Sequence, residues 1–244
     1  DEKTDPMVHI LPHWNWEDNA LRSKVTYKSG ANSGKIPVRI YSNAPSVELF
    51  VDGESQGKKS FVQKTTNYGY RYQQQSENSD RLYLEWPLEW DYKVGTKIEA
   101  VAYDVQGNII ARDKVVTAGT AAKLDAVPER SVISADGYDL SYITVDVQDK
   151  EGNFVPTADN EIYFNISGNG KIVGVDNGNS ETWERYKDYS GIWKRSAFSG
   201  KALVIVQSTK DAGSFTLTAT ASGLQSDSVT IYTSEEDLTG DQIL

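Results

Sequence analysis

Alternating apolar and polar residues fill the stretch from residue 139 to 178 and predict three successive strands. Over residues 143–147, every second side chain is apolar, which is the period of a half-buried strand. A second alternation over residues 162–166 places Phe164 on the apolar side, and a third strand is predicted over residues 171–175. A sheet with one apolar face needs a second layer to cover it. We therefore predict the core of an immunoglobulin-like β-sandwich.

The same pattern continues along the rest of the chain. We expect further strands over residues 7–11, 35–42, 46–51, 57–64, 82–86, 98–103, 108–116, 121–127, 192–197, 203–207, 215–221 and 228–232. Residues 17–34 and 65–81 lack an apolar period and are predicted to be surface loops. No long window has a helical period, so the predicted fold class is all-β, as two immunoglobulin-like antiparallel β-sandwiches in tandem.

A run of small uncharged residues, Thr117-Ala118-Gly119-Thr120, divides the predicted strands into two sets. Domain boundaries commonly fall in such segments. We predict a first β-sandwich over residues 1–118, a second over residues 119–234, and a linker over residues 235–244.

Composition narrows the classes of function. The formal net charge of −10 argues against nucleic-acid binding, because phosphate binding needs a basic surface. There is no cysteine, so stability must come from core burial without disulfides. No apolar run is long enough to predict a membrane span. The chain begins DEKTDP, which we expect to be the interior of a longer protein.

Residues that could carry chemistry are few. His9 and His13 are spaced i, i+4, but no third ligand is suggested nearby, so no metal site is predicted. Neither a nucleophile elbow nor a phosphate-binding glycine loop is present, and we predict no cofactor. Glu85 and Glu89 could suggest a glycosidase pair. We expect them instead to be ordinary surface acids, because the two sandwiches offer no deep cleft.

Aromatic residues allow two interpretations. The chain has 14 tyrosines and 6 tryptophans, and flat rings occur both in sheet cores and on sugar-binding surfaces. Residues 176–191 are predicted to form a long loop. The candidate glycan-stacking residues in and just after it are Trp183, Tyr186, Tyr189 and Trp193.

Several short motifs follow one another in a fixed order. They are HILPHWNW (9–16), IPVRIYSN (36–43), VELFVDG (47–53), GVDNG (174–178), AFSGK (197–201) and IVQS (205–208). In this order they resemble the domains that follow the catalytic barrel in large bacterial β-galactosidases of glycoside hydrolase family 2. The resemblance covers residues 7–232 and is strongest to the exported, wall-anchored enzymes of streptococci.

The resemblance implies that this chain is a fragment of a retaining β-galactosidase. In that family a (β/α)8 barrel supplies both catalytic glutamates, and neither barrel motif occurs here. It implies that the fragment alone is inactive, and that its partners are the barrel of the same parent chain and β-galactoside glycans. The second sandwich would be a bacterial immunoglobulin-like domain. The parent would be extracellular and anchored to the cell surface through regions outside this fragment.

Two functions remain open. As accessory domains, the sandwiches would dock on the barrel and space it, with His13, Trp14 and Trp16 at the rim of the barrel or its active site. The two tryptophans are spaced i, i+2, so we expect at least one to be exposed for docking, unless residues 17–34 fold back over both rings. The alternative is a carbohydrate-binding or adhesin module that uses the candidate stacking aromatics.

Overall fold

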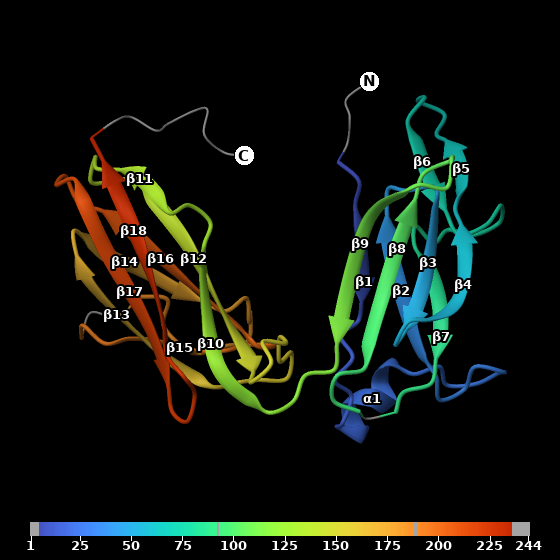
Figure 1. Ribbon diagram of the computed structural model, residues 1–244, viewed down its shortest axis with the longest axis horizontal. Helices are drawn as coiled ribbons and strands as arrows, with labels where there is room; N and C mark the ends of the chain where they lie inside the picture. The colour runs from blue at the N-terminus through green and yellow to red at the C-terminus, as the bar shows by residue number, and fades with distance from the viewer. Residues whose placement is uncertain (1–4, 92, 188–189, 236–244) are drawn as a thin grey trace. The chain divides into compact units, whose positions relative to one another are not determined.

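The structure is a computed structural model that describes residues 5–91, 93–187 and 190–235. The chain divides into two compact units, Asp1–Thr117 and Ala118–Leu244, which are described separately (Figure 1). Apart from α1 (Asn19–Val25), the helices and strands of the described residues are all strands, so the predicted all-β fold class is confirmed. Among the described residues, no helix has the length and apolarity needed to cross a membrane.

The first unit contains two main sheets and a small hairpin. The three-stranded sheet has the order β1-β2-β7, with β1 (Val8–Leu11), β2 (Ile36–Ser42) and β7 (Leu84–Leu88). The four-stranded sheet has the order β4-β3-β8-β9, with β3 (Ser46–Val51), β4 (Glu54–Ser60), β8 (Lys97–Tyr103) and β9 (Ile109–Val116). The hairpin pairs β5 (Val62–Thr65) with β6 (Arg71–Gln74).

Side chains from both main sheets form one core in the first unit. Alternate residues of β2, namely Ile36, Val38 and Ile40, are fully buried and pack in the same cluster as Leu49 of β3 and Ile98 of β8. The intervening residues Pro37, Arg39 and Tyr41 point to the opposite face of the sheet. That outer face carries the candidate site described below.

Turn chemistry fixes the hairpin between β3 and β4. Asp52 and Gly53 have φ angles of 48° and 87°, as a type I′ turn requires, and the sequence Asp-Gly favours this turn. Beyond it, β4 contains no large apolar residue. Its Lys58 and Lys59 ammonium groups lie over the rings of Tyr103 and Trp86, 3.6 and 4.7 Å from the ring centroids.

Three predictions for the first unit were wrong. Residues 17–34 contain a helix, α1 (Asn19–Val25), which Asp18 caps by accepting hydrogen bonds from the backbone of its first turn. Residues 65–81 include β6, which pairs with β5. The strand predicted over residues 82–86 is instead β7 (Leu84–Leu88), and it continues through Pro87, because β7 lies at the edge of its sheet and that position needs no outer hydrogen bond.

The second unit is a sandwich of two sheets. One has the order β10-β12-β16-β14, with β10 (Ala121–Pro128), β12 (Leu140–Asp149), β14 (Gly170–Asp176) and β16 (Lys201–Ser208). The other has the order β11-β18-β17-β13-β15, with β11 (Val132–Ser134), β13 (Glu161–Gly168), β15 (Trp193–Ser196), β17 (Gly213–Ala221) and β18 (Asp227–Ser234). All described pairings in these sheets are antiparallel except β11 with β18, which departs from the expected antiparallel pattern.

The predicted inward phase of the second unit is confirmed. Ile143, Val145 and Val147 of β12 are buried, as are Ile162 and Phe164 of β13, and all belong to one core cluster. At the end of the turn that follows β13, the backbone of Gly170 lies against the Phe215 ring. A Cβ atom at this glycine would come within 2.5 Å of that ring.

Candidate functional site

The tryptophans of the HWNW segment are interior residues. Trp14 is 2% exposed and Trp16 is 7% exposed, and both belong to the core of the first unit. The expectation that at least one would be exposed for docking is therefore wrong. Residues 17–34 fold back against this segment through α1, whose Arg22 donates a hydrogen bond to the Trp16 carbonyl oxygen at 2.8 Å. Arg22 also lies over the ring of Trp90.

His13 is held within the same segment. Its ring stacks on Trp16 with centroids 4.2 Å apart, and its Nδ1 accepts a hydrogen bond from the backbone N–H of Asn15. Burial lowers the pKa of His13, and the nearby Glu17 carboxylate opposes this shift. His13 is therefore half-buried and packs on Trp16. In the described part of the chain, no group of three or more His, Asp or Glu side chains could hold a metal ion.

The candidate glycan-stacking residues that the structure describes differ in their exposure. Trp183 is 99% exposed and Tyr186 is also exposed, whereas Trp193 is partly buried and packs against the core. Tyr189 lies outside the described residues. The described rings thus serve different purposes, and only two of them face solvent.

A buried arginine, which the sequence reasoning missed, holds the loop that carries Trp183. Arg195 of β15 is fully buried and donates hydrogen bonds to the Glu184 carbonyl oxygen at 3.0 Å and to Asn177 Oδ1 at 2.9 Å. Its guanidinium also lies 5.1 Å from the centroid of the Tyr186 ring. These contacts account for Arg195 structurally, as the anchor of the loop.

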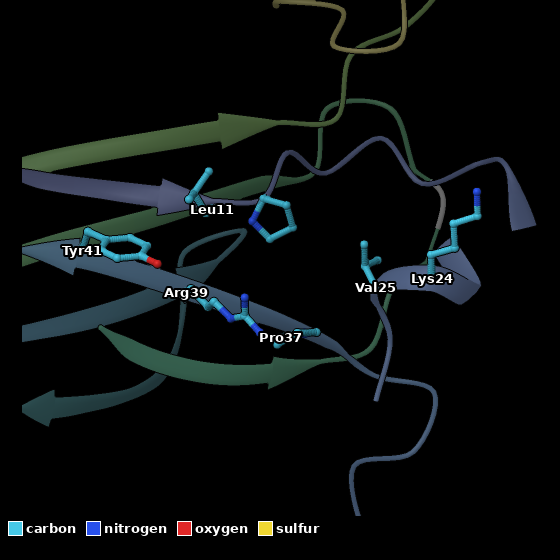
Figure 2. Close-up of a pocket in the computed structure, with 7 residues that line it drawn as sticks. Leu11, Lys24, Val25, Pro37, Arg39 and Tyr41 are labelled. Carbon is cyan, nitrogen blue, oxygen red and sulfur yellow. The ribbon is translucent and has the colours of Figure 1, made fainter. Parts of the chain in front are cut away.

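A hollow of about 390 Å³ opens on the first unit beside the end of β1. Figure 2 shows Leu11 on one side of it and Arg39 and Pro37 on the other, with Tyr41 at one end. Pro12 also lines the hollow. The opposite end is formed by α1, through the side chains Lys24 and Val25 (Figure 2).

Strand register explains why these residues meet. In β2, Arg39 lies between Leu11 of β1 and Glu85 of β7, each directly opposite it in the ladder. Side chains directly opposite in a ladder point to the same face. The outward residues of three strands therefore gather at one place, although they are far apart in the sequence.

The carboxylate beside the hollow is almost enclosed. Glu85 is 7% exposed and accepts hydrogen bonds from Arg39 Nε at 3.1 Å and Arg81 Nη1 at 3.2 Å. The Tyr27 hydroxyl also donates to it. Arg39 lies over the ring of Tyr83, 5.1 Å from the centroid. These contacts fix the guanidinium of Arg39 at the edge of the hollow.

Two of the groups that bond to Glu85 have raised pKa values. The hydrogen bond to Glu85 raises the pKa of Arg39, although burial opposes the shift. Burial, followed by the hydrogen bond to Glu85, raises the pKa of Tyr27 to about 12. Arg39 therefore stays cationic and Tyr27 neutral at all ordinary pH values.

The arrangement suits binding better than hydrolysis. A retaining glycosidase needs two carboxyl groups about 5 to 5.5 Å apart across an open sugar site. Glu85 is occupied by its arginines, and Glu89 is an exposed side chain 3.8 Å from Lys35. What faces the hollow is a fixed cation with apolar and aromatic walls.

Two protein families match the chain. Residues 124–230 match the family described as glycoside hydrolase family 2 C-terminal domain 5. Residues 33–111 match a domain of unknown function, DUF4982. The two matches fall in different units of the structure.

Curated relatives extend across both units. β-Galactosidase BoGH2A of Bacteroides ovatus is 37% identical over 225 residues, covering 92% of this chain and 22% of that protein. A putative β-glucuronidase of Formosa agariphila is 29% identical over 180 residues, covering 71% of this chain and 14% of that protein. The chain thus spans about a fifth or less of the length of these relatives.

Solved structures agree with the sequence matches. A β-glycosidase from Bacteroides vulgatus superposes with a TM-score of 0.68 and 28% identity, over 94% of this chain and 25% of that chain. A glycoside hydrolase family 2 member from Bacteroides cellulosilyticus gives a TM-score of 0.66 and 28% identity, over 93% of this chain and 29% of that chain. The chain therefore consists of C-terminal domains of the kind found in glycoside hydrolase family 2 enzymes.

Proposed function

We propose that the chain is a non-catalytic accessory region of a β-galactosidase that hydrolyses terminal β-galactosides. In this proposal the two units dock on the catalytic barrel of the same parent chain and space it from the modules beyond. The observation that carries the proposal is the 37% identity to a β-galactosidase over 92% of this chain, which takes in both units.

The residues of the chain support a non-catalytic role. Glu85, the carboxylate beside the hollow, is bonded to two arginines and a tyrosine. A general acid must be able to give its proton to the leaving group. The Glu85 carboxylate instead accepts hydrogen bonds from its own neighbours in the first unit. We assign both catalytic glutamates to the parent barrel, as the resemblance implies.

The docking surface of the proposal differs from the one expected at first. Trp14 and Trp16 belong to the core of the first unit, so they stabilise that unit and do not offer a free ring to the barrel. Docking would use outward residues of the same unit, such as Met7, which is an exposed large apolar side chain just before β1. By the same resemblance, we propose an exported parent anchored at the bacterial cell surface.

Kinetics with two chromogenic substrates test the proposal. We expect the parent enzyme to hydrolyse an aryl β-D-galactoside in preference to the matching β-D-glucuronide, and the isolated chain to hydrolyse neither. Preference for the glucuronide would contradict the galactoside assignment. Turnover that co-purifies with the isolated chain through successive columns would contradict the accessory role.

A further inference from the structure

We propose that the hollow beside Arg39 binds a carboxylated sugar, that is, a glycan unit that carries a carboxylate on its pyranose ring. The Arg39 guanidinium would hold the carboxylate, and the walls formed by Tyr41 and the two prolines would hold the ring. This inference is independent of the substrate of the parent enzyme, so either proposal can fail alone.

The charge at the hollow is opposite to the charge of the chain. Two of the lining residues, Lys24 and Arg39, are cationic and none is acidic, although the chain carries a formal net charge of −10. Glu85 lies beside Arg39, but Arg81 and Lys59 also bond to Glu85 and add positive charge there. A cationic concavity on an acidic protein concentrates anions locally, which is a means of selecting a charged ligand.

Arg39 is fixed in position, but part of its guanidinium can still bind a ligand. Its Nε is bonded to Glu85 at 3.1 Å, while its side chain remains 45% exposed. Among the described residues, its two terminal nitrogens make no hydrogen bond. A guanidinium offers paired N–H groups that match the two oxygens of a carboxylate. Because Glu85 and Tyr83 already hold the Arg39 side chain, ligand binding would cost little further side-chain entropy.

The walls of the hollow fit a sugar ring. Leu11, Pro12, Val25 and Pro37 present apolar surface. Tyr41 adds an aromatic ring at one end (Figure 2). The C–H faces of a pyranose can pack on such surfaces while its polar groups bond elsewhere. The volume of about 390 Å³ lies within the range of about 300 to 1,000 Å³ that is usual for small-molecule sites.

The lining of the hollow favours a carboxylated sugar over a bare anion or a neutral sugar. A bare carboxylate would contact Arg39 alone and would leave the apolar walls in water. A neutral sugar would use the walls but would leave the terminal nitrogens of Arg39 and the ammonium group of Lys24 without an anionic ligand group. A carboxylated sugar satisfies both sets of groups, with Lys24 available to a second polar group at the other end.

Titrations followed by protein NMR test the inference on the intact chain. The probes are D-glucuronate and D-galacturonate, with D-glucose and D-galactose as neutral counterparts and acetate as the carboxylate without a ring. We expect the uronates to bind in the millimolar range, to perturb Leu11, Val25 and Tyr41 first, and to bind more weakly as salt is added. Equal binding of the neutral sugars, or of acetate, would overturn the proposal, and so would unperturbed signals at these residues.

Variants identify the cation responsible. Arg39→Gln should weaken uronate binding by about tenfold or more, since a charge-assisted bidentate contact is lost. Arg112→Gln is the matched control, because Arg112 is also an exposed arginine, 51% exposed and 3.1 Å from Glu99, but lies on the other sheet of the unit. It should leave binding unchanged. An equal loss in both variants would mean that only the net charge matters, which contradicts a defined site.

A second variant guards against misfolding. Arg39→Gln removes one partner of a buried carboxylate, so its fold is checked by a thermal melt. In the described part of the chain, Lys24 is not among the groups that bond to Glu85, so Lys24→Gln should fold normally. It should weaken uronate binding a few-fold while leaving the melting temperature unchanged. Unchanged uronate affinity in Lys24→Gln and in a folded Arg39→Gln would overturn the proposal.

Discussion

Glu85 shows how a single charged side chain can be accommodated on the outer face of a sheet. It is 7% exposed, and three donors from separate parts of the first unit reach it. Removing one partner of a buried ion pair is usually more destabilising than replacing the whole pair with apolar residues, because it leaves a buried charge unpaired. Tyr27 has a particular place among these donors, because its hydroxyl is neutral and can itself lose a proton at high pH.

The raised pKa of Tyr27 predicts a pH dependence of stability. Its pKa in the folded chain is about 12, against an ordinary value of 10.0, so folding favours the protonated hydroxyl. The contribution is complete below about pH 10 and is lost as the pH rises toward about 12, because the unfolded chain releases this proton first. We expect the free energy of unfolding to fall less steeply over this range in Tyr27→Phe than in the original chain.

Denaturant unfolding at a series of alkaline pH values measures this difference. Tyr68→Phe is the control, since Tyr68 is an exposed tyrosine of the same unit, and it should keep the slope of the original chain. If Tyr27→Phe and the original chain lose stability in parallel above pH 10, the assignment of this effect to Tyr27 is wrong.

Strands that bury one face were the elements that the sequence could predict. The alternations of β12 and β13 identify their inward residues, because a buried face imposes a period of two. Helix α1 could not be predicted in this way, since it has seven residues and none of them is buried, so it shows no apolar stripe. Strand β6 was missed for the same reason, because only its last residue is buried.

The candidate site was beyond the reach of sequence patterns. Its lining comes from three separate segments, around Pro12, Lys24 and Arg39, which only the pairing of β1 with β2 and the return of α1 bring together. Arg195 was also missed, because a charged residue within a short strand resembles a solvent-facing one. What distinguishes it is the loop wrapped around it, which no local pattern reveals.

Phe164 in β13 offers a direct test of the predicted strand phase. It is buried among the core residues of the second unit, so Phe164→Ala should lower the free energy of unfolding by about 3 to 5 kcal/mol. The adjacent Asn165 is exposed, and Asn165→Ala should change it by only about 0.5 kcal/mol. Denaturant unfolding provides both values, and a loss under about 1 kcal/mol in Phe164→Ala would mean that this ring is not a core residue.

At the scale of the whole chain, stability is divided between two cores. The buried cluster of the first unit and that of the second share no residue, and the division falls between Thr117 and Ala118. A unit with its own core can unfold as its own cooperative transition. The chain therefore need not behave as one two-state system.

We expect calorimetry of the intact chain to resolve two transitions that respond to different substitutions. Phe164→Ala should lower the melting temperature of one transition only. Leu49→Ala, at a fully buried position of the first unit, should lower the other. A shift of both transitions by either substitution would show that the units unfold together.

The lysines of β4 have a consequence for self-association. β4 forms one edge of its sheet, and an unpaired edge is a template on which another chain can add a strand. A strand added there would have to lie beside Lys58 and Lys59, which are held over the rings of Tyr103 and Trp86, and would strip water from both ammonium groups. The opposite edge, β9, also carries charges, at Arg112, Asp113 and Lys114. The four-stranded sheet is thus guarded at both edges against fibre-like growth by where its charges lie.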